Sequence, residues 1–141
     1  MLIYSPLVMA ADLIENYQDA QGNIHPMFQF FRDLNPDYDW SEALQGEPGQ
    51  YAVIARRSGD TYYLAAATNE EARTIRVPLS FLGKGSYTAT IYADGPDAHY
   101  DTNPTSYQIT IQQVSSHTRL KLQLAPGGGC GVIFSPTSDK K

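Results

Sequence analysis

The pattern of apolar and polar positions changes near Gln50. Beyond it the pattern has a period of two, most regularly in 88–93 and 120–124, where apolar side chains alternate with polar ones. This alternation is typical of strands that have one dry and one solvated face. The region therefore predicts antiparallel sheets stacked face to face.

The predicted strands follow one another at short intervals. Ser58-Gly59-Asp60 joins the first two as a hairpin, in which the glycine is free to take a positive φ. The arrangement predicts a mainly β chain, an antiparallel β-sandwich with Greek-key-like connections and about seven strands. The predicted strands are 51–56, 61–68, 74–77, 86–93, 107–114, 119–124 and 131–135.

The first 40 or so residues follow a helical period instead. Ser5-Pro6 opens one predicted helix, and His25-Pro26 opens a second that ends at Asn35-Pro36. We expect a helical segment at 1–43, a β-sandwich domain at 44–135 and a frayed polar tail at 136–141. The apolar positions of the two helices are Leu7, Ala10, Ala11 and Ile14, then Met27, Phe30, Phe31 and Leu34.

Composition narrows the class of protein. A length of 141 residues fits about one domain, and a net charge of -5 gives no basic surface for nucleic acid. The single cysteine, Cys130, cannot form an internal disulfide and is expected to be a small buried hydrophobe. The apolar start is shorter than the ~20 residues of a membrane span. It also contains Pro6 and has no basic residue before it, so neither a membrane partner nor a secretion signal is expected.

The densest polar cluster lies at 94–104. Asp94, Asp97, Asp101 and Asn103 carry oxygen ligands of the kind that calcium prefers. Their spacing is not that of an EF-hand, and Asp-Gly and Asn-Pro are ordinary turn sequences. A structural loop is the favoured interpretation, with the three aspartates as candidate metal ligands.

Other chemical signals are interpreted structurally. Glu70 and Glu71 are adjacent on a predicted turn, so they point apart and form no glycosidase-type pair. The triple glycine at 127–129 lacks the Gly-Lys-Ser/Thr ending of a phosphate loop, and a tight bend is expected. The scattered histidines show no zinc spacing. No catalytic or cofactor-binding residue is therefore assigned.

The tyrosines leave one alternative open, because flat rings suit a sugar-binding surface and also fill strand cores. The sequence does not say which rings lie together on an exposed face. The tyrosines on or next to predicted strands are Tyr51, Tyr62, Tyr63, Tyr87, Tyr92, Tyr100 and Tyr107.

Several motifs in order along the chain resemble the C-terminal end of glycoside hydrolase family 97, of the α-glucosidase and α-galactosidase type. They are YSPLVMAAD at 4–12, FQF at 28–30 ahead of Trp40, GQYAVIARR at 49–57, YADG at 92–95 and LAPGGG at 124–129. The resemblance implies that the helical segment is the last part of a catalytic (β/α)8 barrel. It also implies that the rest is the family's C-terminal β domain.

The resemblance implies a calcium-dependent hydrolase of α-linked sugars, periplasmic or secreted, whose catalytic glutamates lie upstream of this region. The chain alone is then expected to be no enzyme and to need no cofactor. Its expected partner is the catalytic barrel, and the apolar N-terminal segment is expected to fold back on the sandwich or to pair with another copy. Three hypotheses remain: a non-catalytic domain that supports the barrel, an independent carbohydrate-binding module, and a remnant that self-associates.

Overall fold

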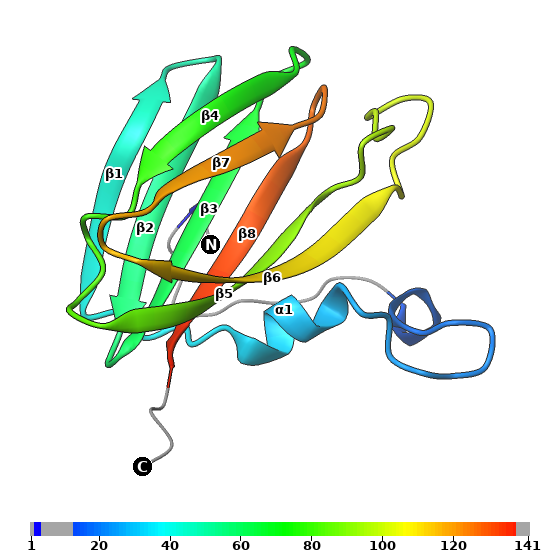
Figure 1. Cartoon of the computed structure of the whole chain (residues 1–141). Coiled ribbons are helices and arrows are strands. Elements are labelled where there is room, and N and C mark those ends of the chain that lie inside the picture. The colour runs from blue at the N-terminus through cyan, green and yellow to red at the C-terminus, as the bar shows by residue number, and fades with distance from the viewer. Residues whose placement is uncertain (1, 4–12, 138–141) are drawn as a thin grey trace.

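The computed structural model describes residues 2–3 and 13–137 of the chain. Within these residues it contains eight strands and two short helices (Figure 1). No helix in that part is long and apolar enough to cross a membrane. The elements are η1 (Ile14–Tyr17), α1 (Phe28–Asp33), β1 (Trp40–Glu47), β2 (Tyr51–Ser58), β3 (Thr61–Thr68), β4 (Arg73–Pro78), β5 (Ser86–Asp94), β6 (Tyr107–Ser115), β7 (Arg119–Leu124) and β8 (Gly129–Pro136).

The strands form two antiparallel sheets. The larger sheet has the order β1-β2-β3-β8-β5-β6, and β4 pairs with β7 in a smaller sheet that lies across one of its faces (Figure 1). The chain crosses between the sheets after β3, β4, β6 and β7. This arrangement confirms the predicted mainly β class and antiparallel sandwich.

The face of the larger sheet toward β4 and β7, here called the inner face, contains the main core. In β7 the predicted alternation appears directly, because Leu120, Leu122 and Leu124 are buried while the residues between them are exposed. These leucines pack with fully buried Leu64 and Phe134 of the larger sheet. Two sheets in contact thus account for the period of two.

The opposite face, the outer face, is covered by α1 (Figure 1). Buried Tyr63, Tyr92 and Ile133 form a second cluster there, and Met27, Phe30, Leu34, Tyr38 and Ile109 pack against it. β3 is consequently buried on both faces, with five consecutive buried residues at its centre. The predicted second helix is therefore confirmed. Of its predicted apolar positions, Met27, Phe30 and Leu34 pack on the sheet, whereas Phe31 is 50% exposed.

Strand β1 was missed by the sequence analysis. Its register shifts between Ala43, which faces Ile54, and Gln45, which faces Val53, so Leu44 is an extra residue in a bulge. A bulge breaks the period of two and hides the strand from a search for alternation. β1 also crosses the expected boundary between residues 43 and 44, so the strand ladder begins at Trp40.

The predicted first helix and the predicted polar tail lie toward the two ends of the chain. Residues 4–12, where the first helix was predicted, lie outside the described residues, and the short helix η1 begins at Ile14. Of the tail expected at 136–141, the first two residues are ordered against the sheet, because β8 includes Pro136 and the Thr137 N–H donates to the Ser86 carbonyl at 2.9 Å. Residues 138–141 lie outside the described residues.

Candidate functional site

The aspartate loop after β5 is held by its own hydrogen bonds. Asp94 Oδ2 accepts from the Ala125 N–H at 2.9 Å, and Asp97 accepts from the Ser106 hydroxyl and, at 3.0 Å, from Asn103 Nδ2. The Ser106 hydrogen bond is the main reason that the pKa of Asp97 lies below its usual value. These contacts support the structural-loop interpretation.

The third predicted candidate, Asp101, is exposed and has its N–H directed to His99 Nδ1 at 3.2 Å. Among the described residues no group of three or more His, Cys, Asp or Glu side chains is arranged to hold a metal ion. The structure therefore keeps the three aspartates in one loop without gathering them around a common point.

The triple glycine forms the predicted tight bend. The Gly128 N–H donates to the Ala125 carbonyl at 2.9 Å across Pro126 and Gly127, and Gly127 has a φ of +67°. This is the pattern of a type II turn. A Cβ on Gly128 would collide with the Asp94 carboxylate. The bend and the aspartate loop are therefore in close contact, and only glycine fits between them.

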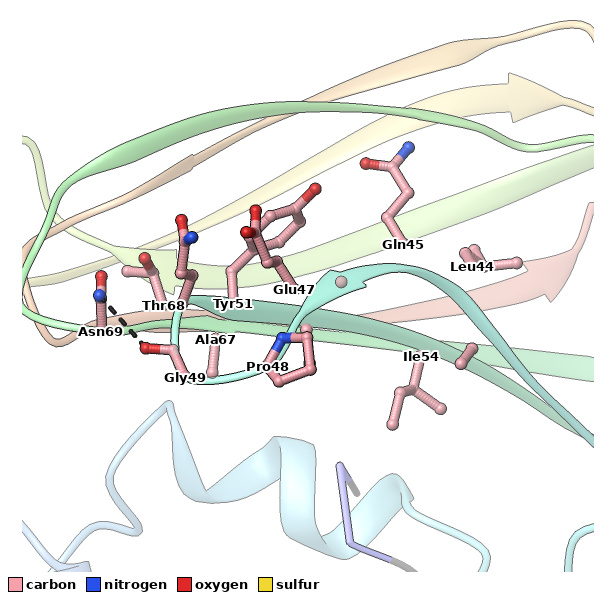
Figure 2. Close-up of a pocket in the computed structure, with 14 residues that line it drawn as sticks. Leu44, Gln45, Glu47, Pro48, Gly49, Tyr51, Ile54, Ala67, Thr68 and Asn69 are labelled. Carbon is pink, nitrogen blue, oxygen red and sulfur yellow. Dashed lines mark hydrogen bonds between the residues drawn. The ribbon is translucent and has the colours of Figure 1, made fainter.

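A groove of about 840 Å³ surrounds the turn between β1 and β2 (Figure 2). In Figure 2 Gln45, Glu47 and Tyr51 lie on one side of the strand ribbon, whereas Pro48 and Ile54 lie on the other. The turn is fixed by Asn69, whose Nδ2 donates to the Gly49 carbonyl at 3.4 Å. The residues that line the groove lie around the edge of the sheet and do not surround a common point.

Carboxylates are not paired at this groove. Glycoside hydrolysis uses two of them across the scissile bond, whereas the acidic side chain among the described residues that line the groove is Glu47. Glu71 lies nearby and pairs with Arg73 at 3.0 Å, with its own side chain largely exposed. Glu70 is likewise exposed.

The tyrosines do not form a common surface. Tyr62, Tyr63, Tyr87 and Tyr92 are all less than 9% exposed, and they divide between the inner and outer clusters. Burial raises the pKa of Tyr63, Tyr87 and Tyr92. Most rings that suggested a sugar-binding platform are thus core residues.

An apolar pocket of about 480 Å³ lies between the N-terminal segment and the outer face of the sheet. Its walls include Phe30 and Tyr92, whose ring centroids are 5.2 Å apart, and Gly131, where a Cβ would collide with the Phe30 ring. Half-buried Cys130 also lines it, and burial raises the pKa of that thiol to about 12. The cysteine is accordingly a packing residue and not a reactive thiol.

Two residues of this face were not found by sequence reasoning. Gly131 was part of a predicted strand, and a glycine inside a strand is itself a signal of close approach. Arg56 is buried, with its guanidinium 5.2 Å from the centre of the Tyr38 ring and Nη2 donating to the Leu2 carbonyl at 3.4 Å. No local signal distinguishes it from the adjacent Arg57, whose side chain is 41% exposed.

Comparison with known proteins finds a matching family model and similar proteins. A family model described as "Glycosyl-hydrolase 97 C-terminal, oligomerisation" matches residues 37–135. A retaining alpha-galactosidase of Bacteroides thetaiotaomicron is 37% identical over 125 residues, which are 89% of this chain and 18% of that protein. A probable retaining alpha-galactosidase of Streptomyces bingchenggensis is 37% identical over 68 residues, 48% of this chain and 11% of that protein.

Two solved structures are also similar to this chain in fold and sequence. A glycoside hydrolase family 97 enzyme from Pseudoalteromonas sp. strain K8, in complex with acarbose, superposes with a TM-score of 0.75 and 38% identity. The match covers 78% of this chain and 18% of that one. A beta-arabinopyranosidase superposes with a TM-score of 0.56 and 27% identity over 79% of this chain and 18% of its own. This chain thus spans less than a fifth of the proteins it matches.

Proposed function

The chain belongs to glycosyl hydrolase family 97 as its C-terminal, non-catalytic domain, and we propose that it supports the catalytic barrel of an α-glycosidase and joins subunits. The observation that carries this proposal is the placement of the match. It covers 37–135, nearly the whole sandwich, and the family model is described by oligomerisation and not by catalysis. The described fold offers packing surfaces and no convergent pair of carboxylates.

The outer face is the proposed attachment to the barrel. We assign residues 1 to about 39 to the last part of the barrel, and α1 then connects it to the sandwich. Phe30 packs on Tyr92, Tyr38 packs on Tyr63 at 5.7 Å between ring centroids, and the Tyr63 hydroxyl donates to the Asp33 carbonyl at 3.3 Å. A tyrosine ring that is buried while its hydroxyl finds a hydrogen-bond partner, as in Tyr63, is typical of contact surfaces.

The proposed substrates of the whole enzyme are α-linked galactosides or glucosides. This proposal rests on the names of the relatives, two of them alpha-galactosidases and one a family 97 enzyme with bound acarbose. The chemistry takes place outside the part of the enzyme that this chain matches. Its contribution to activity is therefore to stability and assembly.

The calcium that the family implies does not fit the acidic loop of this chain. Calcium takes six to eight oxygen ligands, and among the described residues no three acidic side chains are arranged to hold a metal ion. Asp94 and Asp97 already accept hydrogen bonds from Ala125, Ser106 and Asn103, and Asp101 faces solvent. We therefore assign no role in calcium binding to these aspartates.

The proposal is tested on the purified 141-residue chain by three measurements. We expect no release of nitrophenol from aryl α-galactosides or α-glucosides with or without calcium, no heat on titration with the corresponding disaccharides, and a mass above that of one chain by light scattering. Calcium-dependent turnover above a buffer blank would contradict the non-catalytic role. Saturable sugar binding by a monomer would support the carbohydrate-binding alternative instead.

A further inference from the structure

The two edges of the larger sheet differ in how well they are protected from pairing. Natural edge strands carry charges, prolines or bulges, because unpaired backbone N–H and C=O groups attract a further strand. β1, at one edge, has the bulge at Leu44 and the charged residues Glu42 and Glu47, and Pro48 follows it. This edge has the usual protection.

β6, at the other edge, lacks these devices. It contains nine residues, none of them charged or proline, and it pairs with β5 without a register shift from Ser115 opposite Ser86 to Tyr107 opposite Asp94. In the described part of the chain no strand pairs with its outer edge. Its tyrosine, isoleucines, threonine and valine all favour extended backbone. The strand is therefore a regular and open template.

An exposed hydrophobic side chain lies at the centre of this strand. Ile111 is 68% exposed and occupies the middle of 107–115. Side chains two apart in a strand share a face, so Ile111 points to the same side as Ile109, which packs against the cluster under α1. A neighbour placed along β6 would extend this covered apolar surface.

We propose that β6 pairs with β6 of a second copy, antiparallel about a two-fold axis at Ile111, so that the two larger sheets become one continuous sheet. The proposal rests on the proposed joining of subunits and names the surface that performs it. A two-fold contact must be self-complementary. Here Ile111 faces the partner's Ile111, Ile109 faces the partner's Gln113, and Thr110 faces the partner's Gln112.

A second copy suits this strand better than another occupant. The facing pairs contain no like charges, and an isoleucine directly opposite an isoleucine is a favourable cross-strand pair. Backbone pairing of nine residues provides orientation, whereas the central isoleucines provide apolar burial at the axis. The family description by oligomerisation fits a partner of this chemistry.

The first test is sedimentation equilibrium of the full chain and of two single lysine variants. I111K places two like charges opposite each other at the axis and is expected to weaken dimerisation by at least about tenfold. A43K adds the same charge to the exposed centre of the protected edge strand β1 and should leave the dimer as it is. Thermal unfolding by circular dichroism verifies that both variants are folded.

A second test examines the register. T110K/Q112K sets two lysine pairs facing each other across the axis, whereas T110K/Q112E sets two opposite-charge pairs at the same exposed positions. The first variant lowers the overall negative charge of the chain, so general repulsion cannot explain a loss of dimer. We expect T110K/Q112K to be monomeric at concentrations where T110K/Q112E is dimeric.

A third test is covalent. Residues directly opposite in an antiparallel pair have Cα atoms about 4.5–5.5 Å apart, within reach of a disulfide. I111C should therefore form a disulfide-linked dimer under mild oxidation by oxidised glutathione, whereas Q108C, which faces the partner's Val114, should not.

The outcomes separate the two proposals. The β6 interface is overturned if the dimer persists in I111K and in T110K/Q112K and if I111C gives no cross-link. The proposed joining of subunits would still stand, and the apolar N-terminal segment would be the next surface to test. A wild-type chain that stays monomeric at about 100 μM, a concentration at which transient pairs associate, contradicts both.

Discussion

The inner and outer faces of the larger sheet are covered by different elements and to different extents. The inner face packs on β4 and β7 in a core whose largest members, including Phe134 and Leu64, are fully buried. The buried apolar cluster of the outer face has three members, and it depends on α1 for its cover. The difference indicates that packing at the inner face is sufficient to hold the sandwich together, whereas the outer face is an attachment surface.

The largest expected effect is on the inner face. Phe134→Ala removes a fully buried ring that packs edge-on against Phe81, and we expect a loss of about 3–5 kcal/mol in the free energy of unfolding. The matched control on the outer side is Phe31→Ala, whose ring is 50% exposed and should cost less than about 1 kcal/mol. Urea unfolding measures both. Similar losses would remove the distinction between the faces.

A smaller effect is expected where α1 meets the sheet. Gly131→Ala drives a methyl group into the Phe30 ring, and overpacking of this kind costs about 1–3 kcal/mol. In a Phe30→Ala background the same substitution should stabilise the protein by about 0.5–1 kcal/mol, because alanine suits a strand better than glycine. A double-mutant cycle by urea unfolding checks this reversal. Equal effects in both backgrounds would show that α1 does not press on Gly131.

Much of the inner core could be predicted from the sequence, because Leu120, Leu122 and Leu124 of β7 alternate with polar residues and the sequence of β5 alternates in the same way over 88–93. β1 could not be predicted, because the bulge at Leu44 interrupts its alternation. The sides taken by Tyr62 and Tyr63 were equally hidden, since a strand covered on both faces shows no period. For the same reason the sequence did not decide whether the tyrosines form a carbohydrate-binding surface or fill the core.

The smallest effect concerns the acidic loop, which belongs to neither face. The lowered pKa of Asp97 means that its carboxylate adds stability above the pKa of the unfolded state, 3.8, and that this contribution is lost as the pH falls through the lower folded value. Asp97→Asn should therefore be less stable than wild type at neutral pH and equal to it in strong acid. Thermal unfolding across pH measures the difference.

The calcium response is examined in the same experiment. We expect the melting temperatures of wild type and Asp97→Asn to be equally insensitive to added calcium. A calcium-dependent rise in the wild type that is absent in the variant would instead place a metal site in the loop.

The central claim, that the inner face alone sustains the sandwich, is tested most directly by removing residues 1–36. The cut lies ahead of Asp39, which fixes the β2–β3 turn through Arg57 at 2.6 Å and the Gly59 N–H at 2.9 Å, and it keeps the whole of β1. Far-UV circular dichroism with urea unfolding should show an unchanged β spectrum and a cooperative transition at lower urea, together with new dye binding at Tyr63 and Tyr92. Loss of the β spectrum or of cooperativity would contradict the claim and make α1 part of the core.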